Sequence, residues 1–251
     1  KKTINEDLSY KDNILWNRVI ERFKGVCQKA YDNDIKILID AEEVFVQKAI
    51  DDLALLMMRK FNREKPIVFN TVQMYRLDRL KYLSDLLNDK ANNGLIFGFK
   101  LVRGAYMEKE RLIAKSLNVK SPICITKNET DSNFNSGLDF VFNNLDRISL
   151  VCGSHNENSV IKIMEIMKNK NLKVSDDKIW FGQLFGMSDN VTFNLAKMGY
   201  NTFKILPFGP VRNLMPYLIR RAEENTSVKG QTGRELQLIL NERRRRKENN
   251  S

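Results

Sequence analysis

Short apolar runs alternate with longer amphipathic stretches along nearly the whole chain, and this alternation restricts the fold more than any other feature of the sequence. Short runs rich in Ile, Val, Leu and Phe are typical of buried strands, and the stretches between them have helical spacing. Strands that alternate with helices predict an α/β fold with a parallel sheet and right-handed crossovers. Seven strands are expected, at Lys36–Asp40, Pro66–Asn70, Phe97–Arg103, Pro122–Thr126, Ser149–Gly153, Ile179–Leu184 and Thr202–Leu206.

Helices are expected before, between and after these strands. Proline is favoured in the first turn of a helix, so one helix is expected to begin near Pro216. The expected helices are Asn13–Tyr31, Val44–Phe61, Val72–Lys90, Glu108–Leu117, Ser132–Leu145, Asn158–Lys170, Val191–Met198, Pro216–Asn225 and Gly233–Arg246.

The residues that follow the strands favour a closed barrel over a doubly wound sheet. Each expected strand ends in polar, charged or glycine-containing sequence, such as Asp40-Ala41-Glu42-Glu43 and Ser154-His155-Asn156, whereas the opposite loops resemble ordinary turns. Barrels of the (βα)8 type carry their functional groups at the carboxyl ends of the strands. The sequence also lacks the glycine-rich phosphate loops of Rossmann and P-loop enzymes. We therefore expect a distorted (βα)8 TIM-type barrel, and because seven strands are one short of eight, we expect the first strand to be missing from this fragment.

Length and composition predict one globular domain over residues 1–251. Barrels of this length are routinely single domains, and hydrophobic residues make up 42% of the chain. The chain begins with Lys1 and not with an initiator methionine, so we expect an N-terminally truncated fragment or a processed form. The three cysteines have no CxxC spacing and favour a reducing compartment, and the single histidine, His155, excludes zinc sites built on two or three histidines, so no metal is expected.

The formal net charge of +11 has two interpretations. Part of the charge lies in the run Arg243–Lys247, within a polar tail of residues 241–251. This tail is either a solvated helix end or a contact for an anionic membrane surface or a protein partner. Nucleic-acid binding is a third alternative, and we expect no nucleic-acid partner because the site-like strand ends favour an enzyme. No apolar run is long enough to span a membrane.

Charged residues at the strand ends are the first candidates for a site. Asp40 ends an aliphatic strand, where a carboxylate without a partner would be costly to bury, so it needs a cation from among Lys100, Arg103, Arg220 and Arg221.

On the third expected strand, residue alternation places Lys100 and Val102 on one face and Leu101 and Arg103 on the other, with Gly104 permitting a close backbone approach. These charges form either strand-end salt bridges or part of a ligand site.

The stretch PYLIRRAEEN also has two interpretations. Helical spacing aligns Tyr217 with Arg220 or Arg221 and with Glu224. Two guanidinium groups beside an aromatic ring can bind a carboxylate, while the ring packs on the apolar part of the ligand. The alternative is an exposed Arg–Glu pair on a solvated face. For His155, a structural role and a ligand or cofactor contact are both open.

Five motifs together resemble the proline dehydrogenase family, in order and at plausible spacing. They are LIDAEE, KLVRGAYMEKER, SHNENS, GQLFGM and LPFGPVRNLMPYLIRRAEEN, and the resemblance runs from about Ile35 to Leu240. It implies a distorted (βα)8 barrel that binds FAD non-covalently, oxidises L-proline to Δ1-pyrroline-5-carboxylate and passes electrons to a membrane quinone. It also implies a mitochondrial location if the source is eukaryotic, and a cytoplasmic, membrane-peripheral one if it is bacterial.

The resemblance assigns roles to individual residues by position. Arg220 and Arg221 would bind the substrate carboxylate, and Glu224 would hold this arginine layer in place. Asp40 would belong to the ion-pair network under the site and, with Lys100, is a candidate catalytic residue. The residues expected around the pyrrolidine ring are Tyr217, Tyr106, Leu184 and Ile205. Those expected at the cofactor are Asn70, Lys100, Val102, Gly104, Lys127, His155 and Glu224.

The sequence departs from the family pattern at two places. The family's substrate-binding lysine lies on the first barrel strand, which this chain is expected to lack. Ile205 stands where many members have a tyrosine that faces the substrate ring. The loss of that hydroxyl leaves hydroxyproline dehydrogenase of the same family as the alternative function.

Overall fold

The computed structural model describes residues 9–227 and 231–248, and the chain divides into two compact units, Lys1–Ile205 and Leu206–Ser251. The first unit holds the whole sheet. The second holds two helices, α8 (Val211–Ser227) and α9 (Gln231–Glu248).

Six strands, not seven, form one parallel sheet within the described residues, in the spatial order β1-β2-β3-β4-β5-β6. An order that follows the chain without reversal is that of a barrel wall and differs from a doubly wound sheet, whose strand order reverses. The α/β barrel-type fold is therefore confirmed. The strands are β1 (Ile37–Ile39), β2 (Val68–Gln73), β3 (Phe97–Val102), β4 (Ile148–Gly153), β5 (Ile179–Leu184) and β6 (Thr202–Ile205).

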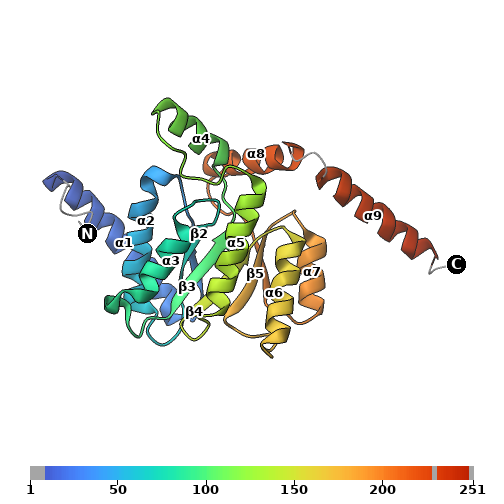
Figure 1. Ribbon diagram of the computed structural model, residues 1–251, viewed down its shortest axis with the longest axis horizontal. Helices are drawn as coiled ribbons and strands as arrows, with labels where there is room; N and C mark the ends of the chain where they lie inside the picture. The colour runs from blue at the N-terminus through green and yellow to red at the C-terminus, as the bar shows by residue number, and fades with distance from the viewer. Residues whose placement is uncertain (1–8, 228–230, 249–251) are drawn as a thin grey trace. The chain divides into compact units, whose positions relative to one another are not determined.

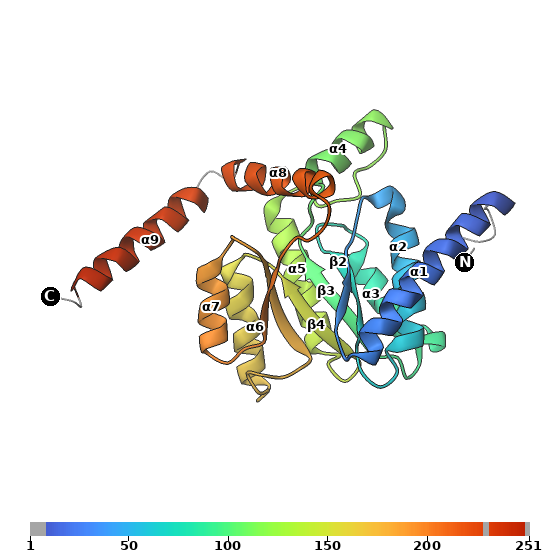
Figure 2. The same ribbon diagram turned by 180° about the vertical axis from the view of Figure 1, so that it is seen from behind.

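Helices follow the strands of the first unit and cover one face of its sheet (Figure 1). Seen from behind, the opposite face of the sheet is turned toward the viewer (Figure 2). The helices of this unit are α1 (Tyr10–Asp32), α2 (Val44–Phe61), α3 (Arg79–Asn88), the 3-10 helix η2 (Lys90–Asn92), α4 (Met107–Ser116), α5 (Lys127–Phe142), α6 (Glu157–Asn169) and α7 (Asp189–Lys197).

The sheet is curved, as a barrel wall must be. Lys36 precedes β1 and Trp180 lies on β5, four strands away. In a flat sheet, strands about 4.8 Å apart would separate them by about 19 Å. The Lys36 Nζ atom nevertheless lies 5.1 Å from the centroid of the Trp180 ring, so the inner face curls around until β1 approaches β5.

The hydrophobic core lies between the outer face of the sheet and the helices. Alternate residues of each strand, such as Phe97 and Phe99 on β3 and Leu150 on β4, are fully buried there against helical side chains such as Met57 and Phe134. The period of two along a strand sends the remaining residues to the inner face, which is where the candidate site lies.

The expected strand Pro122–Thr126 is wrong. This segment makes one antiparallel bridge, between Arg76 and Ile123, and otherwise runs as a loop into α5. The Thr126 hydroxyl accepts from the Glu129 amide at 3.1 Å, and the Glu129 carboxylate accepts from Thr126 in return. This capping box starts a helix at the end of the apolar run, so the run ends in a helix cap.

Three expected helix boundaries are also corrected. β2 continues to Gln73, so α3 begins at Arg79 and not at Val72. The capping box moves the start of α5 from Ser132 to Lys127. Pro216 lies inside α8 and not in its first turn.

The three cysteines are buried, and we expect them to be unreactive in the folded protein. Burial raises the pKa of Cys27 to about 11 and that of Cys152 to about 12, and it also raises the pKa of Cys124. The reactive form of a thiol is the thiolate, so a thiol reagent at pH 8 should label none of the three until the chain is unfolded in urea. Rapid labelling of any thiol in the native protein would contradict this prediction.

Candidate functional site

Lys100 is a buried cation on the inner face of the sheet, near the carboxyl end of β3. Its side chain is 6% exposed, and its Nζ atom pairs with Oδ1 of Asp40 at the end of β1. The Asp40 side chain is 70% exposed, so water solvates the carboxylate while the ammonium group is enclosed. Of the two expected cations whose side chains are described, Lys100 and Arg103, Lys100 pairs with Asp40, and Thr71 Oγ1 lies 3.5 Å from the same carboxylate oxygen.

Arg103 lies on the opposite face and connects β3 to two helices. Its Nε donates to Asp131 on α5 at 2.6 Å, and its terminal nitrogens donate to the hydroxyls of Ser154 and Ser159 at 2.9 and 3.0 Å. The guanidinium also packs on the Phe134 ring, 4.5 Å from its centroid. Arg103 therefore forms strand-end salt bridges and hydrogen bonds, whereas Lys100 faces the interior of the curl.

Lys127 joins the same cluster from the first turn of α5. Its Nζ contacts the second carboxylate oxygen of Asp131 at 2.5 Å, and its side chain is 75% exposed. Burial raises the pKa of Asp131, but the hydrogen bonds from Lys127 and Arg103 outweigh that effect and lower it. The exposed ammonium of Lys127 lies at the carboxyl edge of the sheet, where an anionic ligand group could reach it.

Two glycines let the backbone approach neighbouring groups closely. Gly104 follows β3 with φ +145°, and a Cβ there would overlap the ring of Tyr75. On β4, a Cβ at Gly153 would lie 2.9 Å from Cγ1 of Val102 on β3. The Tyr75 ring and the Val102 side chain therefore pack directly against the backbone at these two glycines.

Four more of the expected residues lie at the carboxyl edge of the sheet. They are Tyr106, Leu184, Ile205 and His155. The Tyr106 hydroxyl donates to Oε2 of Glu42 at 2.5 Å. Leu184 and Ile205 are register partners at the carboxyl ends of β5 and β6, so their side chains lie next to each other on the inner face. Half-buried His155 lies at the end of β4, with Nδ1 3.0 Å from the hydroxyl of Ser188.

Asn70 differs from the expectation. Its side-chain nitrogen donates to Asp51 on α2 at 2.9 Å and to the Tyr82 hydroxyl on α3 at 3.1 Å. These partners place the Asn70 side chain among the helices, on the face away from Lys100. The reason is the period of two: Thr71, one residue later, points inward.

Gln73 is a candidate that sequence reasoning missed. It lies two residues beyond Thr71 on the same face, in register with Val102, and is 3% exposed. Its Oε1 atom is buried and has no hydrogen-bond partner among the described residues. Because a buried amide oxygen without a partner is costly, this atom is suited to a ligand donor. The alternation of residues along β2 places Gln73 on the inner face. The strand expected from the sequence ended at Asn70, so the alternation was not extended to Gln73.

The remaining expected residues belong to the second unit. Tyr217 lies on α8 and is half-buried. The side chains of Arg220, Arg221 and Glu224, on the same helix, lie outside the described residues. Their roles stay predictions from the resemblance.

Comparison with known proteins decides the family. The sequence model described as proline dehydrogenase matches residues 1–234 of this chain. The chain belongs to the proline dehydrogenase family. This confirms the resemblance found in the sequence motifs.

Curated relatives agree over most of the chain. It is 37% identical over 246 residues to Proline dehydrogenase 1, mitochondrial, of Drosophila melanogaster, covering 94% of this chain and 36% of the relative. It is 36% identical over 231 residues to the carbapenem antibiotics biosynthesis protein CarD of Pectobacterium carotovorum subsp. carotovorum, covering 92% and 59%. A hydroxyproline dehydrogenase of Xenopus laevis is 35% identical over 243 residues, covering 95% and 52%. The chain thus spans between about a third and three fifths of these relatives' own lengths.

A solved structure supports the fold. Proline utilization A (PutA) from Bdellovibrio bacteriovorus, inactivated by N-propargylglycine, superposes with a TM-score of 0.77 at 23% identity, covering 85% of this chain and 22% of that one. At this identity, the likeness extends to the fold alone.

Proposed function

We propose that this chain is the barrel of a flavin-dependent enzyme that oxidises L-proline to Δ1-pyrroline-5-carboxylate and passes the electrons to a membrane quinone. The observation that carries the proposal is the buried ammonium group of Lys100 on the inner face, in a chain of the proline dehydrogenase family. A fixed positive charge enclosed in the curl of a barrel is where an electron-rich group would be stabilised.

The inner face fits a flavin. The unpartnered oxygen of Gln73 can accept a hydrogen bond from a ring N–H, and Lys100 supplies a buried positive charge beside it on the next strand. We infer that FAD would be held by Gln73, Lys100, Val102, Gly104, Lys127 and His155, with Glu224 contributing from α8. When bound, FAD supplies the acceptor for the hydride from the proline ring.

The protein's own part in the reaction is binding and orientation. By resemblance, Arg220 and Arg221 bind the carboxylate of the substrate bidentately. Tyr106, Tyr217 and Leu184 pack around the pyrrolidine ring, so that its C5 hydrogen faces the cofactor. Asp40 holds the Lys100 ammonium from the solvent side.

Hydroxyproline is the alternative substrate because of Ile205. Its aliphatic side chain lies beside Leu184 and is smaller than a tyrosine ring. A relative in Xenopus laevis is named hydroxyproline dehydrogenase, which supports this alternative.

The purified protein, loaded with FAD and mixed anaerobically with L-proline, should lose its oxidised flavin absorbance. The same measurement with 4-hydroxyproline, followed by kcat/KM for each, distinguishes the two substrates. An Ile205→Tyr variant should lower kcat/KM for hydroxyproline relative to proline by about tenfold, because the larger ring occupies the space of the 4-hydroxyl. Persistence of the oxidised spectrum with both substrates would reject the proposed function.

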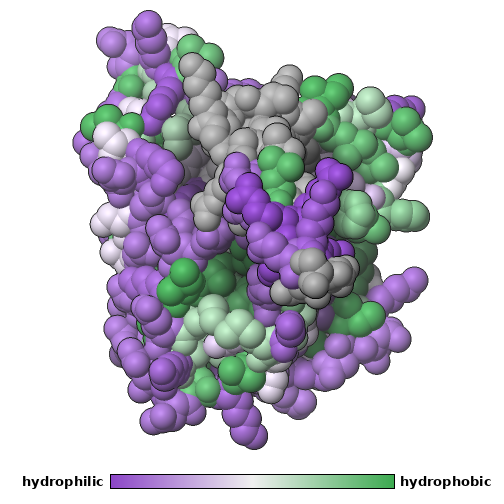
Figure 3. Space-filling model, turned by 90° about the vertical axis from the view of Figure 1, so that its right-hand side faces the viewer, coloured by the Kyte–Doolittle hydropathy of each residue, from purple (hydrophilic) through white to green (hydrophobic). Residues whose placement is uncertain are grey.

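The basic residues of α9 provide a contact for the membrane that contains the quinone. Arg243, Arg244 and Lys247 are exposed, as are Arg245 and Arg246, which pair with Glu242 at 2.8 and 2.9 Å. No helix among the described residues is long and apolar enough to cross a bilayer. The face in Figure 3 is mostly hydrophilic, with its apolar residues in separate groups. The exposed cations of α9 are the attraction that such a contact would use.

Co-sedimentation with vesicles tests this contact. Vesicles containing anionic lipid should retain the protein at low salt and release it as salt rises, because the attraction is screened. Deletion of Arg243–Lys247 should abolish retention, and retention unaffected by the deletion would reject the membrane contact.

The cellular location depends on the source organism. Several relatives, such as the Drosophila protein, are named mitochondrial. A bacterial source would place the enzyme in the cytoplasm at the inner membrane.

A further inference from the structure

The loop between β1 and α2, residues Asp40–Glu43, carries Asp40 and Glu42 into the candidate site. Two of the amides along this segment are bound by buried side chains from elsewhere. The Glu42 amide donates to Oε1 of Gln47 at 2.8 Å, and the Val44 amide, directly after the loop, donates to Oε1 of Glu110 at 2.7 Å. The loop backbone is therefore held at both of these points by side chains that are buried away from water.

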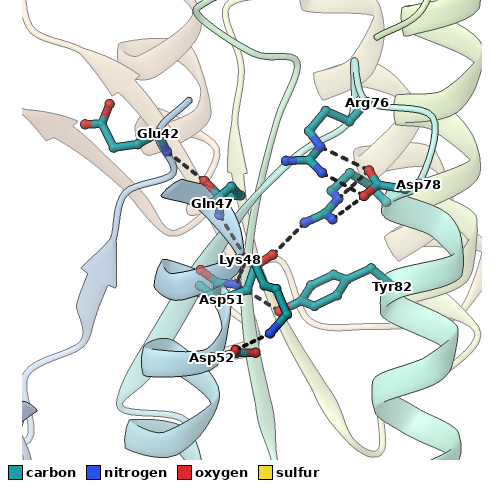
Figure 4. Close-up of polar contacts among 10 residues, drawn as sticks. Glu42, Gln47, Lys48, Asp51, Asp52, Arg76, Asp78 and Tyr82 are labelled. Carbon is teal, nitrogen blue, oxygen red and sulfur yellow. Dashed lines mark hydrogen bonds and ion pairs between the residues drawn. The ribbon is translucent and has the colours of Figure 1, made fainter. Parts of the chain in front are cut away.

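Gln47 is itself held in one orientation. It is 1% exposed, and its side-chain nitrogen donates to Oδ1 of Asp51, one turn along α2, at 2.9 Å. The other oxygen of Asp51 accepts from Arg79 of α3 at 2.7 Å (Figure 4). With its nitrogen directed at a carboxylate, the amide of Gln47 must present its oxygen to Glu42.

Glu110 reaches the loop from α4. It is 3% exposed and binds the first amide of α2, whose own cap residue, Glu43, makes no side-chain capping bond. A carboxylate at a helix N-terminus satisfies a free amide and interacts favourably with the positive end of the helix dipole. Glu110 thus caps a helix that lies 66 residues earlier in the chain.

Tyr106 is the N-cap residue of α4, directly before its first turn. The Glu110 amide donates to the Tyr106 carbonyl at 2.9 Å, and the Tyr106 hydroxyl returns to the loop at Glu42. Lys109 adds an ion pair to Glu43 at 2.5 Å. The loop and the first turn of α4 therefore form one interlocked set in which the positions of Asp40 and Tyr106 depend on each other.

We propose that Gln47 and Glu110 are positioning residues that hold the Asp40–Glu43 loop, and through it Tyr106, in the arrangement that binds substrate. Both side chains are buried, and each acts through a backbone amide. The link to the substrate rests on the proposed function, whereas the hold on the loop does not.

Hydrogen exchange at the loop tests the hold directly. Glu110→Leu removes the acceptor for Val44, and Gln47→Leu removes the acceptor for Glu42. Each variant should speed exchange of its own amide by about tenfold or more, because the amide becomes free to exchange by local opening. Glu110→Gln keeps an oxygen at the same place and should preserve the protection. Glu108→Leu, at an exposed position of the same helix, is the matched control and should change nothing.

Kinetics then test the consequence for the site. Glu110→Leu and Gln47→Leu should raise the KM for the amino-acid substrate by about tenfold with a smaller change in kcat, because a displaced Tyr106 weakens ground-state and transition-state binding together. Glu110→Gln should restore the KM. If Glu110→Leu does not fold, Gln47→Leu and Glu110→Gln decide the matter.

Unchanged exchange at residues 42–44 in folded loss variants would overturn the proposal, as would a wild-type KM in both. Failure of the proposed function has a different signature: the wild-type protein would turn over neither proline nor hydroxyproline, whatever the exchange of the loop.

Discussion

Replacing Lys100 with methionine is expected to lower kcat/KM for L-proline by about 100- to 1000-fold while the protein stays folded. The ammonium group is enclosed on the inner face, where a fixed charge acts through a low dielectric and is not replaced by water. Methionine fills a similar volume and carries no charge. The measurement is steady-state oxidation with an artificial electron acceptor, together with the Tm of each variant.

The asymmetry of the Lys100–Asp40 pair explains why the fold should survive. Asp40 is 70% exposed and would be solvated by water after the loss of its partner, so no buried charge is left without compensation. Lys100→Arg keeps the positive charge and is the matched control, with activity expected much closer to wild type. A Lys100→Met enzyme with kcat/KM within about threefold of wild type would contradict the role given to the buried charge.

Replacing Arg79 with methionine is expected to lower the free energy of unfolding by about 3–5 kcal/mol. Arg79 and Asp51 form an ion pair at 2.7 Å in which each side chain is only 7% exposed. Without the arginine, the Asp51 carboxylate is left buried with only the amide donors of Gln47 and Asn70. The arginine also packs over the Tyr82 ring, 4.6 Å from its centroid, and that contact is lost as well.

The second carboxylate bound by Arg79 adds little to this loss. Asp78 is 51% exposed and keeps two hydrogen bonds from Arg76, at 3.0 and 2.7 Å. Burial raises its pKa, but the bonds from Arg79 and Arg76 outweigh this and lower the pKa to about 2. A lowered folded-state pKa means that the contribution of Asp78 is present above about pH 4 and is lost as the pH falls through about 2. Unfolding at pH 7 therefore measures the contribution of Asp78 in full.

Urea unfolding of three variants separates charge burial from packing. Asp51→Asn combined with Arg79→Met removes both charges and should recover about 2 kcal/mol of the loss seen for Arg79→Met alone. Lys48→Met breaks an exposed pair with Asp52 on the same helix, with side chains 68% and 45% exposed, and should cost less than about 0.5 kcal/mol. A loss below about 1 kcal/mol for Arg79→Met would show that the pair is not an essential buried interaction.

Two of the strands were predictable from local pattern. β3 and β5 appear at nearly the expected residues, because a buried parallel strand is a continuous apolar run bounded by turns. The run Pro122–Thr126 looks the same locally but is a loop, because the capping box of Thr126 and Glu129 starts a helix where a strand was expected. Apolar runs this short do not by themselves distinguish a strand from a buried loop.

Family membership, the barrel-type fold and the identity of most candidate side chains are properties of the sequence by itself, because motif residues and apolar periodicity are local. Which face each side chain occupies was decided by tertiary structure. On β2, Asn70 points outward and is bonded to Asp51 among the helices, whereas Thr71 and Gln73 point inward. The choice of Lys100 as the partner of Asp40, and the capping of α2 by Glu110, depend on how strands and helices distant in the chain meet. Such pairings arise from the curl of the sheet and the burial of charge, which no local pattern of residues records.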